Sequence, residues 1–433
     1  MRMGRWVVLV MVLLSAGRAS ASTDINGLFD ARSTGMGGAG VAFLDSAAGI
    51  PTNPALLDQI DKLAITLNAF YIRSQPEAPY TIYHVDANGQ RSKTYESIRS
   101  DAASAVLPFG GVAYRLFDWM VLGLAAYPVI GQGTAATFRP APNEIPALVA
   151  TNDAAMGLVE IQEAASFKIS DNLSFGAGWR ITYMTQSVST PVETKGAPAG
   201  ILIDRSKNAV NANIDVTGLN FLGFQFGVLY KPIPSLRLAL TYRSKVTVDG
   251  EGTTTTTNPV NGMLIVNPTR TGYTNPHSLR GGAALSVLGD SLLLAFDVKY
   301  NMYAEAFKVL DTFITMNGVE ERIQRPAYWK DSVSGSFGGE YKVADALRLR
   351  LGYNFTTSAT PDEYALAFMA PPGVAHLITG GLGTKLFDSL NVDFAAAYVQ
   401  LVSRVEVATE YNAGVGNYAS RGIELSFSAT YRM

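Results

Sequence analysis

The segment IELSFSATYRM, residues 423–433, alternates between apolar and polar side chains at every position. Successive side chains of a β-strand point to opposite faces, so this order places all the apolar groups on one face. The length matches the about 9–11 residues that a tilted strand needs to cross a bilayer. The same alternation recurs from residue 62 onward, most clearly in the segments 173–186, 236–243, 291–301, 332–342, 347–356 and 390–400.

The composition indicates that these strands face lipid. Hydrophobic residues make up 48% of the chain, and its mean hydropathy is +0.13. After the amino-terminal segment, however, no apolar run approaches the roughly 20 residues of a spanning helix. Hydrocarbon tolerates no unpaired backbone, so a closed barrel is the remaining way to span a membrane. The competing interpretation is a large soluble β-protein, which would stay folded without detergent.

The amino terminus predicts export. Two arginines precede the apolar run 6–14, and small residues surround a cleavage site expected after Ala21. We interpret residues 1–21 as a cleaved signal peptide and predict a location in the bacterial outer membrane. Without its three arginines the chain keeps 31 basic against 36 acidic residues, a net charge of −5, which does not favour nucleic acid. There is no cysteine, hence no disulfide framework.

The connections alternate in length, as in outer-membrane barrels with short periplasmic turns and long outer loops. Short turns are expected at 116–118, 170–172, 231–235, 288–291, 343–346 and 387–389. Long loops are expected at 75–102, 129–156, 187–210, 250–276, 303–326, 357–373 and 402–419. These thirteen connections predict an all-β fold, a transmembrane antiparallel barrel of fourteen strands over residues 62–433, with both ends in the periplasm.

Residues 22–61 do not alternate and contain a glycine-rich motif, in which Gly35, Gly37 and Gly40 match G-x-G-x-x-G and Gly38 adds a fourth glycine. A dinucleotide site would need this motif between a strand and a helix of a parallel unit, which the surrounding sequence does not offer. Glycines that allow tight bends in a confined space are the simpler interpretation. We therefore predict neither a cofactor nor a metal.

The sequence here resembles a known family. ARSTGMGGAGVA at 31–42, followed by Asn53, Pro54 and Ala55, is similar to the amino-terminal hatch of the FadL/TodX/OMPP1 transporters of long-chain fatty acids and hydrocarbons. Further similar segments are 242–246 with 249–252, 329–332, 347–353 and 360–362. The resemblance implies a fourteen-stranded barrel plugged by a hatch at 22–61. It also implies capture of an apolar substrate on outer loops, transfer to a pocket beside the hatch, and exit through the barrel wall after the hatch moves. By spacing alone, Asn53-Pro54 would be an ordinary turn.

Two apolar runs in long loops are candidates for capture. They comprise Ile201, Leu202 and Ile203 in the third loop and Met263, Leu264, Ile265 and Val266 in the fourth. An exposed apolar site is otherwise unusual on a soluble surface. The resemblance implies that a capture groove lies between these two loops. The alternative is that each run packs within its own loop hairpin.

The third strand departs from the alternation because both of its faces are apolar. Leu122, Leu124 and Ala126 lie on one face, and Pro128 ends the strand. The preceding strand, 103–115, contains Pro108 and Gly110, residue types that interrupt or bend a ladder. We predict that substrate leaves through this part of the wall, where the resemblance also places the family's lateral opening. Alternatively, the inner face simply packs on the hatch.

Inward arginines are candidates to hold a substrate carboxylate, because a guanidinium group matches it in geometry and charge. Arg180, Arg237 and Arg243 have the right parity, although such arginines can instead pair with lumen acids such as Asp297, Glu340 and Asp393. Whether the substrate is a fatty acid or an uncharged hydrocarbon stays open.

The leading hypothesis is passive transport of hydrophobic compounds by a monomer that contacts outer-membrane lipid and lipopolysaccharide. A non-conducting assembly or adhesion component with the same fold is the alternative. An enzyme is not expected, because the three histidines, His84, His277 and His376, have no nearby G-x-S-x-G motif or metal-ligand spacing. A general hydrophilic porin conflicts with the hatch.

Overall fold

The computed structural model describes residues 29–85, 91–138, 150–191, 201–204, 211–257, 263–366 and 371–433. The predicted signal peptide, residues 1–21, and the first residues of the predicted hatch lie outside these ranges. Among the described residues, no helix combines the length and apolar character of a membrane span.

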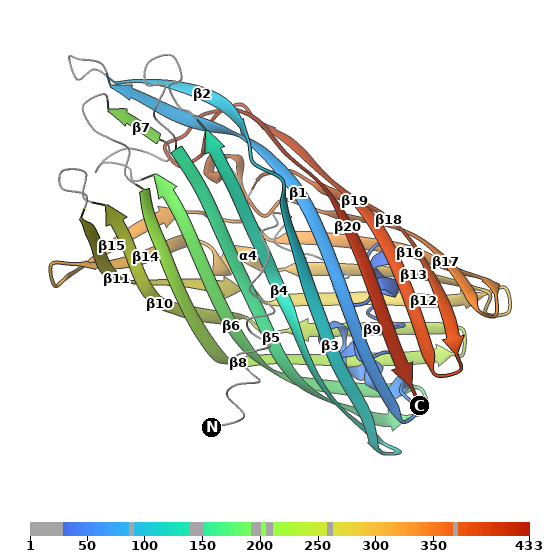
Figure 1. The fold of residues 1–433 in the computed structure, drawn as a ribbon. Coiled ribbons are helices and arrows are strands. Elements are labelled where there is room, and N and C mark those ends of the chain that lie inside the picture. The colour runs from blue at the N-terminus through green and yellow to red at the C-terminus, as the bar shows by residue number, and fades with distance from the viewer. Residues whose placement is uncertain are drawn as a thin grey trace.

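Fourteen antiparallel strands pair side by side in a closed ring (Figure 1). They are β1 (Leu63–Val85), β3 (Ala103–Phe117), β4 (Met120–Phe138), β5 (Ala150–Ser170), β6 (Leu173–Pro191), β8 (Asn211–Ile233), β9 (Leu236–Arg243), β12 (Ser278–Val287), β13 (Leu292–Asn301), β16 (Ser332–Ala344), β17 (Leu347–Thr356), β18 (Ala375–Phe387), β19 (Leu390–Val405) and β20 (Gly416–Arg432). The ring closes where β20 pairs with β1, from Ala64 opposite Arg432 to Glu77 opposite Ala419. The predicted all-β, fourteen-stranded barrel is confirmed.

Side-chain burial confirms which face of each strand meets lipid. On β17, Leu347, Leu349 and Leu351 are exposed, up to 75% for Leu351, whereas Arg350 between them is buried in the lumen. β20 repeats this order, with Ile423, Leu425 and Phe427 exposed and the intervening polar residues buried. An apolar outer face and a polar inner face are the arrangement that a bilayer requires of a barrel.

Six additional strands extend the barrel at its outer end, where sequence analysis expected loops. They are β2 (Arg91–Arg99), β7 (Ile201–Asp204), β10 (Val246–Thr257), β11 (Leu264–Asn275), β14 (Val309–Met316) and β15 (Val319–Pro326). Figure 1 shows β2, β7, β11, β14 and β15 at the end away from the carboxyl terminus. The expectation of loops was wrong there because alternation identifies a strand only where its two faces meet different surroundings. The run Thr253–Thr257 within β10, for instance, has no alternation.

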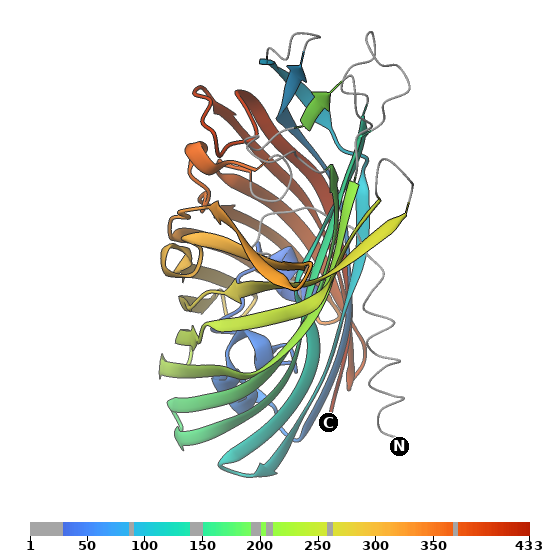
Figure 2. The same ribbon diagram turned by 90° about the vertical axis from the view of Figure 1, so that its left-hand side faces the viewer.

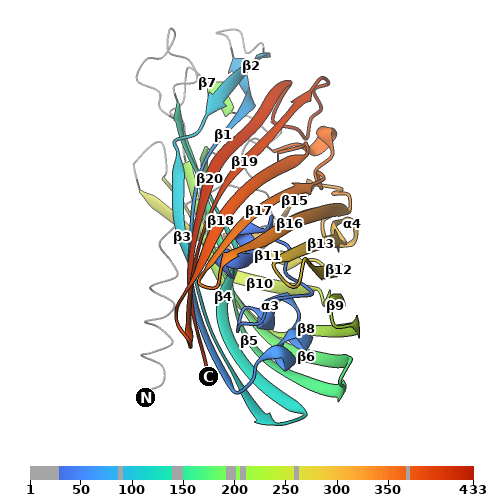
Figure 3. The ribbon, with the colours of Figure 1, turned by 90° about the vertical axis from the view of Figure 1, so that its right-hand side faces the viewer.

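The amino-terminal segment folds inside the barrel. Figures 2 and 3 show this blue segment enclosed by the wall. It contains the short helices α2 (Ala31–Gly35) and α3 (Gly49–Thr52) and the 3-10 helix η1 (Pro54–Gln59). Asp30 caps α2 by accepting a hydrogen bond from the Arg32 amide, and Asn53 caps η1 in the same way from the Ala55 amide. We call the described residues 29–62 the hatch.

Candidate functional site

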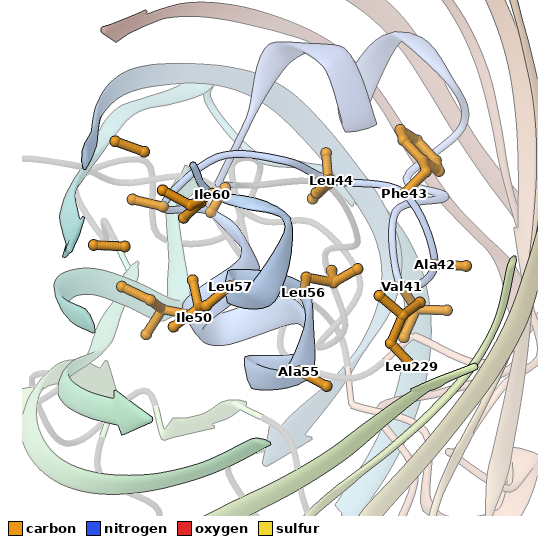
Figure 4. Packing of buried hydrophobic residues seen from close by; sticks show 14 of the residues in the cluster. Val41, Ala42, Phe43, Leu44, Ile50, Ala55, Leu56, Leu57, Ile60 and Leu229 are labelled. Carbon is orange, nitrogen blue, oxygen red and sulfur yellow. The ribbon is translucent and has the colours of Figure 1, made fainter. Parts of the chain in front are cut away.

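The hatch supplies the hydrophobic core of the barrel. Its buried apolar side chains point toward one another and toward the wall (Figure 4). They include Val41, Phe43, Leu44, Ile50, Leu56, Leu57 and Ile60. The wall contributes Phe109, Val121, Ala125 and Leu229, among others. Burying each large side chain is worth about 1.5–3 kcal/mol, so the hatch is firmly held in the lumen.

The glycine motif lies against the wall at a point where backbones touch. Gly37 has a φ of +69°, and a Cβ placed on it would lie 2.5 Å from the Tyr353 carbonyl oxygen and 2.8 Å from that of Phe337. Its amide donates to Thr379 Oγ1 (3.0 Å), whose hydroxyl donates to the Gly35 carbonyl oxygen (3.0 Å). The motif therefore allows the hatch backbone to pack directly against strands β16 to β18. This structural role agrees with the interpretation that its glycines allow tight bends in a confined space.

The other hatch residues named from the sequence also contact the wall or brace the hatch. Gly38 has a φ of +81°, and the Gly40 amide donates to Asp297 Oδ2 (2.8 Å). Asn53 donates to the carbonyl oxygens of Val41 (3.1 Å) and Val228 (3.2 Å). Pro54 and Ala55 lie so close to Gly176 of β6 that no side chain fits there.

Ion pairs tie the hatch to the wall of the barrel. Arg32 bridges Glu340 of β16 (2.8 Å) and Asp45 of the hatch (3.2 Å), and Arg432 of β20 also binds Asp45 (2.6 Å). Glu340 and Asp393 both pair with Arg350, and Asp297 pairs with Arg280. The lumen acids named from the sequence are thus matched by arginines.

The pKa values of two hatch carboxyls are shifted in opposite directions. Burial, with a smaller effect of the Asp393 carboxylate, raises the pKa of the Asp30 carboxyl to about 6. Burial also acts to raise the pKa of Asp45, but the guanidinium groups of Arg32 and Arg432 outweigh it and leave this pKa below its ordinary value. Asp30 therefore gains a proton at a higher pH than Asp45 does.

The ladder between β3 and β4 stops partway up the wall. It runs from Phe117 opposite Met120 to Gly110 opposite Ala126, with a register shift between Arg115 and Phe117. Beyond Gly110, β3 pairs only with β1, while β4 continues along β5. We call this interruption the first seam.

The residues predicted to form the exit surround the first seam. Gly110 and Ala126 form its last paired position, and Leu122 and Leu124 are exposed on the outer face. Pro108 lies beyond the end of the ladder, and a register shift follows Pro128 in the β4–β5 ladder. On the inside, the Phe29 ring lies 4.9 Å from that of Tyr127 and 5.9 Å from that of Phe109. The inner face of β4 also packs on the hatch, as the alternative interpretation of this strand expects, and the exit stays a prediction.

The three candidate arginines lie at different places in the barrel. Arg180 is fully buried and bound to Glu160 (2.8 Å), and Arg243 binds the other oxygen of the same carboxylate (2.6 Å). Arg237 lies at the start of β9, opposite Ala284 of β12. Of the three, Arg243 alone lines the cavity beside the hatch.

This cavity has a volume of about 80 Å³, more than the roughly 10–15 Å³ that one water needs. Phe29, Leu44, Val129 and Tyr303 give it apolar walls. Arg243, Arg280 and Lys299 add basic groups and Asp30 adds a carboxyl, and Arg243 and Arg280 are paired with Glu160 and Asp297. Arg280 and Lys299 were not among the candidates predicted from the sequence. Lys299 shares the inner face of strand 292–301 with Asp297, and this parity could have indicated it.

Next to the cavity lies an aromatic cluster that was not predicted from the sequence, because most of its members come from segments expected to be loops. Phe307 and Trp329 stack at 4.4 Å between ring centroids, and Tyr303 and Tyr273 pack at their edges. Tyr303 belongs to α4 (Tyr303–Ala306) and lines the cavity as well. Val129 packs against both this cluster and the hatch core, so the two apolar regions are continuous.

The two apolar loop runs join different strands. Met263, Leu264, Ile265 and Val266 are exposed at the start of β11, which pairs with β10 and β14. Ile201, Leu202 and Ile203 belong to β7, which pairs in parallel with the outer end of β1, from Ile82 to Val85. The structure describes the backbone of β7 but not the contacts of its side chains.

Comparisons with known proteins agree with this architecture. A family model for the outer membrane protein transport protein (OMPP1/FadL/TodX) matches residues 12–432. Among solved structures, a Pseudomonas aeruginosa FadL homologue superposes with a TM-score of 0.75 at 19% identity, covering 96% of this chain and 100% of that one. The toluene transporter TodX of P. putida gives 0.70 at 16% identity, covering 96% and 99%. The toluene transporter TbuX of Ralstonia pickettii gives 0.69 at 15% identity, covering 94% and 98%.

A search of curated proteins finds no match to the chain. The solved structures, all below 25% identity, establish the fold, and the family model covers nearly the whole sequence. The chain belongs to the OMPP1/FadL/TodX family of outer-membrane transport proteins for hydrophobic compounds.

Proposed function

We propose that this protein, exported after removal of residues 1–21, carries apolar molecules with a carboxylate, such as long-chain fatty acids, passively across the outer membrane. The ligand is captured on outer loops, enters the cavity beside the hatch, and leaves sideways through the first seam. The observation that carries the proposal is a plugged barrel whose wall pairing is interrupted beside the plug. A plug excludes a straight aqueous pore, whereas an interrupted ladder leaves an apolar way out.

The cavity supports a ligand with a charged end. Arg243, Arg280 and Lys299 line it together with aromatic and aliphatic groups. A carboxylate would find cationic partners there, and the apolar tail would extend along the aromatic cluster. Two of the similar structures are toluene transporters, so competition between toluene and oleate would separate an uncharged from a charged substrate. The absence of uptake of either compound would favour the non-conducting alternative.

The first seam can be tested with Ala126→Arg. Ala126 sits at the last paired position of the seam, where a long charged side chain would obstruct the exit. Uptake of labelled oleate by proteoliposomes should fall at least about tenfold, the effect of roughly 1.4 kcal/mol on a barrier. Heat-modifiable migration on gels should show that the barrel still folds.

Ala283→Arg is the matched control for this variant. Ala283 belongs to β12, whose ladders to β9 and β13 are continuous at that position. It introduces the same charge on the lipid-facing side, at a cost of about 2–4 kcal/mol near the bilayer centre. Its uptake should stay near the wild-type rate. Normal uptake by Ala126→Arg would rule out the first seam as the exit.

Capture on the outer loops can be tested with Leu264→Asp combined with Val266→Asp. These exposed side chains would lose their apolar contact with the ligand, worth on the order of 1.5–3 kcal/mol each when fully buried. The oleate concentration for half-maximal uptake should rise about tenfold or more, while the maximal rate changes little. Val319→Asp on β15 is an equally exposed control that should change neither value. An unchanged half-maximal concentration in the double variant would remove residues 263–266 from the capture site.

A further inference from the structure

The wall has a second interruption, on the edge of β8 that faces β9 and β10. The β8–β9 ladder ends at Gln225 opposite Arg243, and the β8–β10 ladder begins at Thr217 opposite Glu251. Within the described residues 211–257, positions 218–224 and 244–250 therefore belong to neither ladder. We call this interruption the second seam.

Apart from one bond between backbone groups, side chains make the hydrogen bonds that cross the second seam in the described residues. Arg180 donates to the Ser244 carbonyl oxygen (2.7 Å), and Asn220 donates to that of Thr247 (2.7 Å). Ser244 and Phe224 exchange two more bonds, Ser244 amide to Phe224 carbonyl oxygen (2.9 Å) and Phe224 amide to Ser244 Oγ (2.8 Å). Because unpaired backbone is costly in lipid, these side chains keep the seam tolerable. They can also move without unpairing a ladder.

Apolar groups line both sides of the second seam. Met184, Val248 and their neighbours on the inside belong to the same buried cluster as Phe307 and Trp329. On the outside, Phe221 and Leu222 are both exposed, because a register shift in the β6–β8 ladder inserts an extra residue there. Such bulges are frequent next to functional sites. Apolar groups thus lie on both faces of the wall at the second seam, next to the aromatic cluster on the inside and toward lipid on the outside.

One buried carboxylate connects the two seams. Glu160 binds Arg180, which spans the second seam, and accepts a hydrogen bond from Tyr127 (2.8 Å), which lies at the inner side of the first. Arg180 and Glu160 both have side-chain exposures of 0%. These contacts hold the Arg180 side chain within the wall, where it cannot reach a ligand carboxylate in the cavity.

We propose that the second seam is a further lateral port, which takes an apolar ligand from the aromatic cluster into the membrane, and that Arg180 is the positioning residue that keeps it closed. The inference rests on the proposed transport function. It adds a route to that function: ligand held by Phe307 and Trp329 can reach the bilayer without passing the hatch.

A reversible lock tests this port. The chain has no cysteine, so Asn220→Cys combined with Val248→Cys introduces a single cysteine pair. These two positions would be opposite each other if the β8–β9 and β8–β10 ladders continued through the seam in their observed register. Oxidation should lower oleate uptake by proteoliposomes, and a reductant should restore it. The decrease should reach about tenfold when Ala126→Arg has already blocked the first seam. The control pair Leu401→Cys with Ser420→Cys joins partners of the continuous β19–β20 ladder and should be insensitive to oxidation.

A second variant tests the gate. Arg180→Ala in the Ala126→Arg background should increase oleate uptake several-fold, and Arg180→Lys should reverse much of this increase. Arg350→Ala, which removes an equally buried arginine from a strand with two continuous ladders, should not increase it.

The possible outcomes are distinct. If oxidation of the cysteine pair changes oleate uptake in neither background, the second port is overturned. It is also overturned if the Arg180→Ala barrel passes a hydrophilic sugar as readily as oleate, because that would indicate a general defect of the wall. If the wild-type protein takes up no oleate, the transport function fails and the port falls with it. A lock that acts only in its oxidised form supports the port.

Discussion

Replacing Gly37 with valine is expected to expel the hatch from its place and turn the plugged barrel into an open channel. Two effects combine at this residue. Its φ of +69° is strained for a β-branched side chain, at a cost of about 1–3 kcal/mol. The added Cβ would also lie 2.5 Å and 2.7 Å from backbone atoms of Tyr353 and 2.8 Å from the Phe337 carbonyl oxygen.

The wall cannot yield to relieve this clash. Tyr353 pairs with Phe337 on one side and with Ile378 on the other, so its backbone is fixed by two ladders. The hatch must move instead, and it loses the bond from the Gly37 amide to Thr379 when it does. Single-channel recordings in planar bilayers should show steady conductance for Gly37→Val, where the wild-type barrel stays closed.

Gly318→Val separates backbone strain from the fit against the wall. Gly318 also has a positive φ, +78°, but no atom lies within 4 Å of an added Cβ in the outer hairpin of β14 and β15. This variant should be destabilised locally and remain closed. Conductance of equal size in both variants, or a closed Gly37→Val barrel, would contradict the described fit of the hatch.

The sequence could predict the barrel because lipid imposes a simple rule on each strand. Leu347, Leu349 and Leu351 must face hydrocarbon, so their alternation with polar residues is visible in the sequence. Outside the membrane this rule disappears, and β10, β11, β14 and β15 were therefore expected to be loops. The predicted number of fourteen strands was still correct, because these additional strands extend the wall and do not form part of the closed ring.

The site was less predictable because its contacts join distant parts of the chain. The Gly37 amide donates a hydrogen bond to Thr379, which is 342 positions away in the sequence, and no residue near the glycine motif indicates that partner. The first seam could be predicted, since Pro108, Gly110 and Pro128 are residue types that disturb a ladder. The second seam has no proline to indicate it, and the parity of Arg180 showed that it faces inward but not that Glu160 holds it there.

Glu160→Ala is expected to cause the largest loss of stability among single substitutions in the wall. Glu160 is fully buried and binds Arg180 (2.8 Å), Arg243 (2.6 Å) and the Tyr127 hydroxyl (2.8 Å). Removing one partner of a buried ion pair leaves an uncompensated charge and costs about 3–5 kcal/mol. Unfolding by denaturant in detergent micelles should show this decrease in the free energy of unfolding.

Comparison with other glutamates decides whether the network or burial alone causes the effect. Glu424 is also buried, but its Oε2 has no hydrogen-bond partner among the described residues. Glu424→Gln replaces a buried carboxyl, which has no ion-pair partner among the described residues, with an uncharged amide of nearly the same shape, so it should leave stability unchanged or raise it. Glu305 is exposed and paired with Lys245, so Glu305→Ala should lower the free energy of unfolding by less than about 1 kcal/mol.

A double-mutant cycle with Arg180 completes the test, because it isolates the energy of the Glu160–Arg180 pair from that of each side chain. Removing both charges with Glu160→Ala and Arg180→Met should recover part of the lost stability, since no isolated charge then remains between these two positions. The same double variant should take up oleate faster than the wild type, because Arg180 no longer spans the second seam. A double variant whose loss equals the sum of the two single losses would show that the pair does not act as a unit, and Glu160 could then not connect the two seams.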